Sequence, residues 1–319
     1  MNRRSLTLLG AAATPVLAAA AASTLLATPA AGTAAAPTGP AAPVVTLPRP
    51  AADHPDLRGA TAPVRGTVPG LTGAAAVAAA GPAADRFRAV RLAASAGVAR
   101  PADTLHTDWG VFLPNSMSSG LQVTQSVLPG VTTQGSNDWL YAPTALSAGK
   151  ACIEMTTAYT PTGPKLWAWD WCTTDTVGKL VNLDSDFLST YTTTVNGLPA
   201  YSMNQTLSNA SANTWTASLF NYRTHAWDTF YTSSGTQDLN FAFGWDTYEV
   251  YTDSGFFCTA TAGKTVESSD IRLWINGAWT PATPTTAPLS SSPPPGSSFR
   301  CPSLRLAMVT PNSDWTARN

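Results

Sequence analysis

The chain has 319 residues, of which 44% are hydrophobic and only 12% are charged, and its formal net charge is −1. The charge is unevenly spread: nine arginines oppose four aspartates before Leu105, a net +5, whereas the remainder holds nine basic and fifteen acidic residues, a net −6. An acidic domain lacks the basic surface that attracts nucleic acid, so we expect no nucleic-acid partner.

Residues 1–36 have the pattern of an export signal. Arg3 and Arg4 precede an uncharged run rich in Ala and Leu, and one of the possible cleavage sites lies in the small residues at 34–36. The order Arg3-Arg4-x-Leu6 resembles a twin-arginine signal, and an ordinary secretory signal is the alternative. We therefore expect a secreted, extracellular protein with no membrane span after signal removal.

Residues 37–104 are dominated by Ala, Pro, Gly and Thr, and Phe87 is their only aromatic residue. This composition buries too little apolar surface to offset chain entropy, which predicts a disordered linker or pro-segment. The Ala- and Arg-rich stretch 83–100 is an exception, because it favours a short helix that is marginal in water. A pro-helix, or contact with an acidic surface, is the alternative interpretation of that stretch.

Residues 105–319 contain all the tryptophans and cysteines, and they are numerous enough for one domain with a hydrophobic core. Short segments rich in β-branched and aromatic residues recur between turn residues, and no long helical period is present. The pattern predicts an all-β fold, a two-sheet antiparallel β-sandwich of the jelly-roll, concanavalin-A-like kind. Strands are expected at 121–127, 139–142, 151–159, 165–172, 180–184, 191–195, 200–207, 215–220, 227–232, 243–251, 271–275 and 304–310.

The four cysteines form two disulfides if the protein is exported, and three pairings are possible. We favour Cys152 with Cys172 and Cys258 with Cys301. The second bond would close the Pro-, Ser- and Thr-rich excursion 281–298 and attach the last strand to the domain.

The segment from Cys152 to Cys172 predicts a β-hairpin, because its two arms flank a loop with two prolines and a glycine. A five-residue loop at 160–164 places Glu154 opposite Asp170, so both carboxylates share one face. The other face carries the tryptophans of the second arm and is the expected core face: Trp167, Trp169 and Trp171. Opposed like charges destabilise a sheet. Either both acids are solvated, or the register is off by one residue, or the pair shares a proton or a cation.

Two motifs carry a family resemblance. The stretch Trp215-Thr-Ala-Ser-Leu-Phe-Asn221, followed by Trp227, and the stretch Gly244-Trp-Asp-Thr-Tyr-Glu-Val-Tyr251 resemble exported bacterial β-sandwich proteins of little-known function. Those proteins are similar to concanavalin-A-like lectin and glucanase sandwiches. The resemblance covers residues 139–251 and implies a two-sheet jelly roll with a concave face, but it implies no activity.

The strand 243–251 provides the best candidate binding residues. Alternation puts Trp245, Glu249 and Tyr251 on one face. Aromatic rings beside a carboxylate are typical of a sugar site, where rings stack on the sugar and the acid accepts hydrogen bonds from hydroxyl groups. The alternative is that the rings belong to the core and Glu249 is a buried, paired acid.

A hydrolase is the second hypothesis. Glycoside hydrolysis needs two carboxyl groups, and Glu249, Glu154 and Asp170 are the candidate catalytic residues. The E-x-D-x-x-E strand of laminarinase-type sandwiches is absent. Gln134-Gly135, and Trp245 with Glu249, resemble parts of the glutamic peptidases. That family, however, places its Glu one residue nearer the Trp and has a Gly-Ile-Asp-Gly turn that is missing here.

Other chemistry has weaker support. His106 and His225 lack the spacing of a catalytic triad, and no metal-binding motif occurs, so neither a metal nor a cofactor is expected. Alternating oxygens at Asn182, Asp184 and Asp186 offer a weak Ca²⁺ site. The first expectation is therefore a secreted, non-catalytic domain that binds a glycan or another cell-surface polymer through Trp245, Glu249, Tyr251, Glu154 and Asp170. A structural envelope protein is the third hypothesis.

Overall fold

The computed structural model describes residues 62–95, 105–115, 118–134, 138–237 and 243–319. In these residues two sheets account for most of the structure, and their strands are antiparallel except where β1 (Val64–Thr67) runs parallel to β12 (Ala226–Ser234). The prediction of an all-β, two-sheet sandwich is confirmed. The predicted export signal at 1–36 lies outside the described residues.

The larger sheet has the order β1-β12-β11-β10-β4-β14-β17-β16, with β9 beside β10 and β15 beside β14. Its other strands are β4 (Gly120–Ser126), β9 (Thr192–Val195), β10 (Leu198–Asn209), β11 (Thr214–Asn221), β14 (Thr265–Ile275), β15 (Ala278–Pro281), β16 (Arg305–Thr310) and β17 (Asp314–Arg318). The strands predicted at 215–220 and 227–232 correspond to β11 and β12, which form a hairpin in which Asn221 pairs with Ala226.

The seven-stranded sheet has the order β2-β8-β7-β6-β5-β13-β3. Its strands are β2 (Leu71–Thr72), β3 (Leu105–Pro114), β5 (Asp138–Leu146), β6 (Ile153–Thr160), β7 (Gly163–Asp170), β8 (Thr176–Asn182) and β13 (Phe243–Thr252). Short helices join or cover the strands: α1 (Gly73–Ala80), α2 (Pro82–Ser95), α3 (Ser185–Tyr191), α4 (Phe256–Ala260) and the 3-10 turn η1 (Gly296–Phe299). None of the described helices is long and apolar enough to cross a membrane.

The sandwich core lies between the two sheets, and aromatic side chains from both of them fill it. The ring centroids of Trp109 on β3 and Trp315 on β17 are 6.4 Å apart. Polar contacts also cross this layer: the hydroxyl groups of Thr157 on β6 and Tyr201 on β10 are 2.8 Å apart. The inner faces are therefore joined by packing and by satisfied hydrogen bonds.

The hairpin β6–β7 has a tighter turn than the sequence predicts. Thr160 pairs with Gly163, so only two residues form the loop. Pro161 suits the first central position of such a turn, and Gly163 has φ 103°, which glycine adopts without strain. The register therefore differs by one residue from the prediction. Glu154 lies opposite Trp169, and Ile153 lies opposite Asp170.

This shift corrects two predictions, because a slip of one residue moves a side chain to the other face. Glu154 and Asp170 do not share a face, so the expected opposed carboxylates are not formed. Trp167 and Trp169 lie on the face of Glu154 rather than with Ile153. The question of solvated or proton-sharing opposed acids therefore does not arise.

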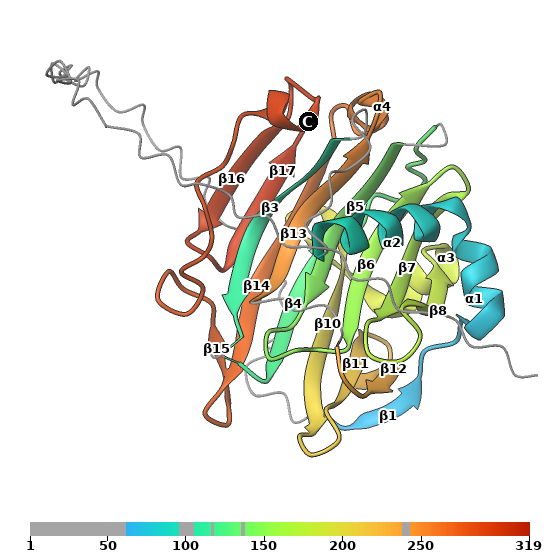
Figure 1. Cartoon of the computed structure of the whole chain (residues 1–319), viewed down its shortest axis with the longest axis vertical. Coiled ribbons are helices and arrows are strands. Elements are labelled where there is room, and N and C mark those ends of the chain that lie inside the picture. The colour runs from blue at the N-terminus through green and yellow to red at the C-terminus, as the bar shows by residue number, and fades with distance from the viewer. Residues whose placement is uncertain (1–61, 96–104, 116–117, 135–137, 238–242) are drawn as a thin grey trace, which may run out of the picture. The chain divides into compact units, whose positions relative to one another are not determined.

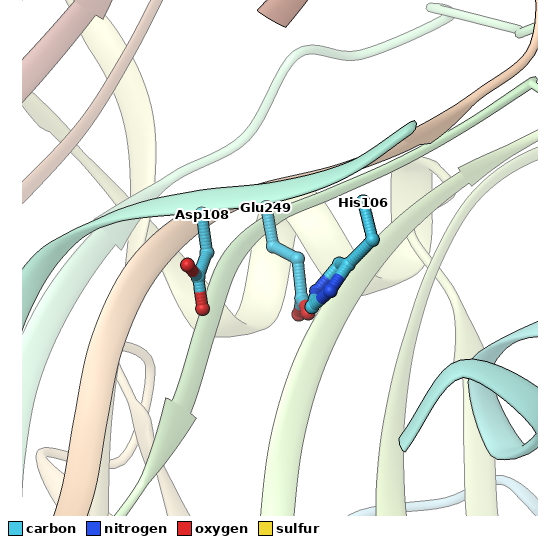
Figure 2. Close-up of side chains that lie close together, drawn as sticks. All are labelled: His106, Asp108 and Glu249. Atoms are coloured by element: carbon cyan, nitrogen blue, oxygen red, sulfur yellow. The ribbon is translucent and has the colours of Figure 1, made fainter. Parts of the chain in front are cut away.

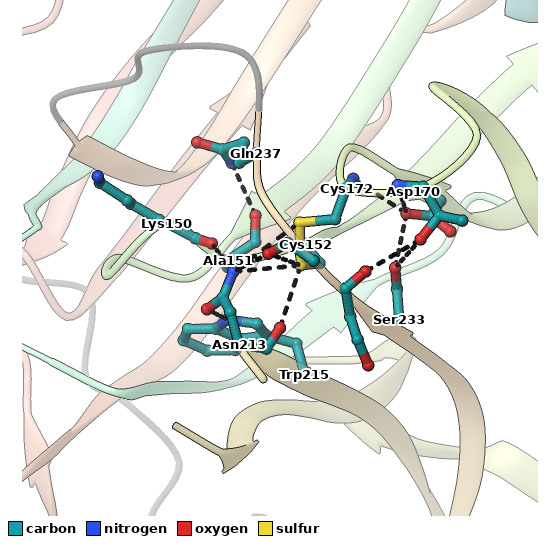
Figure 3. The surroundings of a disulfide bond; sticks show 12 residues. Lys150, Ala151, Cys152, Asp170, Cys172, Asn213, Trp215, Ser233 and Gln237 are labelled. Carbon is teal, nitrogen blue, oxygen red and sulfur yellow. Dashed lines mark hydrogen bonds between the residues drawn. A yellow bond between two sulfur atoms is a disulfide. The ribbon is translucent and has the colours of Figure 1, made fainter. Parts of the chain in front are cut away.

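Both predicted disulfides are confirmed. Cys152 and Cys172 are bonded with a Cα–Cα distance of 5.0 Å, and Cys258 and Cys301 with a distance of 5.3 Å. Around the first bond, Asn213 contacts both the sulfur of Cys152 and the carbonyl oxygen of Lys150 (Figure 3). The bond thus closes the open end of the β6–β7 hairpin, and Asn213 connects that end to the turn before β11.

Residues 62–95 differ from the disorder that their composition predicts. They contain β1, β2, α1 and α2, and the two helices lie over the seven-stranded sheet in front of β6, β7 and β8 (Figure 1). Phe87 on α2 is 0% exposed. A single aromatic residue is too little for residues 62–95 to form a core of their own. That residue packs instead on an aromatic surface that the sandwich supplies. The short helix expected at 83–100 corresponds to α2.

Candidate functional site

The candidate site lies on the face of the seven-stranded sheet that α1 and α2 cover. We call it the covered face and define it by six buried residues on neighbouring strands: Tyr141, Glu154, Trp167, Trp169, Glu249 and Tyr251. Residues directly opposite each other in a ladder share a face, and the pairs Glu154–Trp169 and Tyr141–Glu249 place the set on one side. The predicted alternation of Trp245, Glu249 and Tyr251 also holds, because the β13–β3 ladder is regular.

Glu249 is the centre of a hydrogen-bonded group on β3 and β13. Its Oε1 atom is 2.6 Å from Nε2 of His106 and accepts a hydrogen bond of 2.8 Å from the Tyr251 hydroxyl. The rings of His106 and Tyr251 stack with centroids 4.5 Å apart. Figure 2 shows His106, Asp108 and Glu249 extending to the same side of the sheet, with the Glu249 carboxylate against the imidazole. Donors that converge on one oxygen stabilise negative charge there.

Glu154 is the second buried carboxyl group of the covered face, and it is 0% exposed. Its Oε1 accepts hydrogen bonds from the Thr144 hydroxyl at 2.7 Å and the Trp245 indole at 3.0 Å. Its Oε2 accepts one from the Trp171 indole at 3.0 Å. Buried acids need such partners, since an unpaired buried carboxylate is very costly.

Trp245 lies on the same strand and the same face as Glu249, and its indole N–H donates a hydrogen bond to Glu154 on β6. Only β5 separates β6, which carries Glu154, from β13. An extra residue in β5 between Tyr141 and Thr144 changes the register there, so both of these side chains belong to the covered face. The two acids therefore lie on one face of the sheet, and each is held by its own hydrogen-bond partners.

Asp170, the third candidate acid, lies away from this group. Its Oδ2 accepts a hydrogen bond from the Tyr231 hydroxyl at 2.9 Å and its Oδ1 one from Ser233 at 2.7 Å, both on β12 of the other sheet (Figure 3). Its Oδ1 also accepts from the backbone N–H of Cys172 and Thr173. Asp170 thus links the two sheets and stabilises the turn after β7.

Two further candidates have other surroundings. Gln134 is exposed and lines a shallow pocket of about 340 Å³ with residues 129–132 and the α4 region, so nothing in the structure brings it to Glu249. In the weak Ca²⁺ motif, the Asp184 carboxylate caps α3 by accepting from the N–H groups of Asp186 and Phe187, and Asn182 accepts from Lys165. The oxygens of Asp184 and Asn182 are used in these contacts.

A fourth acid, Asp246, lies on the inner face of β13. It accepts hydrogen bonds of 2.6 Å from the Gln125 side chain and 2.6 Å from the Trp315 indole. Complete burial raises the pKa of Asp246 to about 6, because desolvation penalises the charged form. It faces the sandwich core and so does not belong to the covered face.

His106 and Asp108 are site residues that were not predicted from the sequence, because β3 was not among the expected strands. The available signal was the alternation of Trp109, Val111 and Leu113, which lie on the inner face while His106 and Asp108 lie on the covered face. Ligand atoms of His106, Asp108 and Glu249 all lie within 4.8 Å of one another, which is a donor set that a divalent metal accepts. In this structure Nε2 of His106 and Oε1 of Glu249 are instead hydrogen-bonded to each other.

Comparisons with known proteins give a distant structural likeness. No protein-family model matches the sequence, and no curated protein matches it. Two crystal structures of scytalido-glutamic peptidase, with a transition state analog inhibitor and with a peptide-based transition state analog, are 11% and 10% identical, with TM-scores of 0.38 and 0.37. SCP-B, a member of the Eqolisin family of peptidases in complex with the tripeptide Ala-Ile-His, is 10% identical with a TM-score of 0.33. Each match covers 67% of this chain and 98% of the peptidase chain. At such low scores no activity is transferred by likeness, and the function has to be argued from the residues.

Proposed function

We propose that the chain is the exported, covered form of a hydrolase that uses Glu154 and Glu249 as its pair of working carboxyl groups. The observation that carries the proposal is that both acids are wholly buried and hydrogen-bonded on the covered face of one sheet. Two carboxyl groups on one face can supply a general acid and a general base to a substrate that binds there. Two disulfides fit an oxidising, extracellular compartment.

Glu249 is better suited to act as the base. It contacts His106, and a charged imidazolium favours the ionised carboxylate. Its carboxylate would take a proton from an attacking water molecule. The second working carboxyl group is Glu154, which two indoles and one hydroxyl group hold in place by hydrogen bonds.

The substrate that we favour is a polypeptide. The covered face is occupied by a segment of polypeptide, residues 62–95, whose Ala83 carbonyl oxygen accepts a hydrogen bond of 2.7 Å from Tyr141. The glycan-binding alternative needs exposed rings, but Trp245 is 2% exposed and Tyr251 is 0% exposed. In this form of the chain, no ring of the expected sugar platform is open to a polymer.

The test uses the full-length chain cut between Ser95 and Leu105, so that residues 62–95 can leave the covered face, and compares the wild type with Glu249→Gln and Glu154→Gln on an unfolded protein substrate at acidic pH. Loss of either acid should lower the hydrolysis rate by about 100-fold to 10,000-fold, as general acid–base catalysis contributes that much. The matched control is Glu267→Gln, since Glu267 is a buried Glu of the other sheet that accepts a hydrogen bond from Asn196. It should keep full activity.

Undiminished hydrolysis by Glu249→Gln would remove the hydrolase proposal. A polysaccharide pull-down on the same samples covers the alternative. Retention of a glycan by the wild-type chain, lost in Trp245→Ala and without hydrolysis of any substrate, would establish the binding function instead.

A further inference from the structure

The side chain of Phe87 is enclosed by an aromatic cage. Its ring lies 4.9 Å from that of Trp169, 5.1 Å from Tyr141, 6.0 Å from Trp167, 6.1 Å from Trp171 and 6.2 Å from Tyr251, measured between centroids. The Tyr141 contact is edge-on, which is a favoured geometry for aromatic pairs. We call these five rings the Phe87 cage. Two members, Trp171 and Tyr251, also donate hydrogen bonds to Glu154 and Glu249.

The contacts around the cage are made largely with the main chain of the covering segment. Tyr141 donates to the Ala83 carbonyl oxygen, and the Lys179 ammonium donates to the Val68 carbonyl oxygen. At the edges of the two sheets, β2 pairs with β8 and β1 pairs with β12. Proteins bind peptides in this way: main-chain hydrogen bonds provide affinity for many sequences, and a side-chain pocket selects one residue type.

Apart from Phe87, residues 62–95 make few strong contacts with the sandwich. The strands β1 and β2 have four and two residues, and α1 consists of Gly, Ala and Val. Among residues 62–89, whose side chains the structure describes, the buried apolar side chains besides Phe87 are small: Val68, Ala76, Ala80, Ala83 and Ala84. The ion pairs Arg86–Asp253 and Arg88–Asp175 are partly exposed, and such pairs add little. Occupation of the covered face therefore depends mainly on Phe87.

We propose that the Phe87 cage is the subsite that selects an aromatic side chain of a polypeptide, and that residues 62–95 occupy it as a competitor within the same chain. The inference deepens the proposed function, and rests on it for the statement that the bound polypeptide is a substrate. Binding at the cage itself requires no catalysis. When the segment leaves, the cage places an aromatic side chain beside the two acids.

The experiment cuts the covering segment from the folded full-length chain. A protease recognition sequence is inserted between Ser95 and Leu105, the purified protein is cut, and release of the segment is followed by size-exclusion chromatography and tryptophan fluorescence. Two synthetic peptides of residues 82–90 are then added as competitors, one with the native sequence and one with Phe87→Ala. The native peptide should displace the segment at concentrations at least about 10-fold lower, because it alone fills the cage.

A variant of the full-length chain gives an independent readout. In Phe87→Ala, acrylamide should quench the cage tryptophans more strongly and amide exchange in β7 should rise by about 100-fold, as expected for loss of a buried aromatic side chain. The control is Asp85→Ala, an exposed residue of the same helix, which should behave as the wild type. Equal displacement by the two peptides, or no displacement at any concentration, would overturn the subsite.

The two proposals fail in different ways. Displacement that depends on Phe87, without hydrolysis by any variant, would keep the subsite and remove the hydrolase. If hydrolysis depends on Glu249 but peptides with and without aromatic residues are cleaved at equal rates, the hydrolase proposal stands and the subsite proposal is wrong.

Discussion

Single residues decide how this protein responds to pH, and Asp246 is the clearest case. It is completely buried between the sheets, where Gln125 and Trp315 donate to its two oxygens. The donors stabilise the charged form, but desolvation outweighs them and raises its pKa to about 6. The folded state therefore binds this proton more tightly than the unfolded chain does.

The sign of the pH effect follows. Because the pKa of Asp246 is raised in the folded state, its contribution to stability is complete below the unfolded pKa and is lost as pH rises toward about 6. The loss amounts to about 3 kcal/mol, since each unit of pKa shift corresponds to about 1.4 kcal/mol. Urea unfolding at about pH 4 and about pH 6.5 should show this difference for the wild type and a smaller one for Asp246→Asn. The exposed Asp186→Asn is the control, and an equal pH dependence in all three proteins would contradict the assignment.

Elements of the fold are positioned by their turns and crosslinks. In the β6–β7 hairpin, the tight turn at Pro161 sets a register that puts Trp169 beside Glu154 on the covered face. The disulfide Cys152–Cys172 closes the open end of this hairpin, and Cys258–Cys301 connects α4 with the second residue after η1. Both bonds restrict the unfolded chain, more strongly where the closed loop is longer.

Removal of each bond should therefore have a graded effect. The sequence separations are 20 for Cys152–Cys172 and 43 for Cys258–Cys301. Loop entropy predicts losses of about 3 kcal/mol and about 4 kcal/mol for the two Cys→Ala double variants. Denaturant unfolding of both variants at one pH measures the difference. A larger loss for the shorter loop would show that native packing around Asn213, rather than chain entropy, dominates.

On the scale of the whole molecule, the described structure has two parts of different local stability, the sandwich and the segment 62–95. The sandwich has a large core that joins two broad sheets. The segment 62–95 is attached by short edge strands, by α1 and α2, and, among its described side chains, by the large buried ring of Phe87. Regions with few buried apolar contacts open more easily than the core around them.

Native-state hydrogen exchange should display this difference directly. Amides of α1, α2, β1 and β2 should exchange at least about 100-fold faster than those of the central strands β4 and β6, because local opening of the segment leaves both sheets intact. Mass spectrometry of peptic fragments resolves the two groups. Equal protection of the segment and the central strands would mean that the segment folds and unfolds together with the sandwich.

Part of the site was predictable from the sequence, because it depends on local rules. Alternation along 243–251 placed Trp245, Glu249 and Tyr251 on one face, and the ladder with β3 confirms it. Glu154 was predicted as a candidate, but the residue expected opposite it was wrong. A five-residue loop would pair it with Asp170, whereas the two-residue loop of the structure pairs it with Trp169. His106 and Asp108 were missed because their importance comes from pairing with a strand more than a hundred residues later.

The sequence by itself determined the all-β class, the presence of two disulfides and the alternation of side chains along most strands, while the choice among three cysteine pairings was confirmed only by the structure. The first three follow from local periodicity and from an even number of cysteines. Only the tertiary structure decided which acids share a face, and that Phe87 lies in an aromatic cage above them. Its apolar partners come from strands far away in the chain, so the free energy that orders residues 62–95 is not present in that segment until the sandwich has formed.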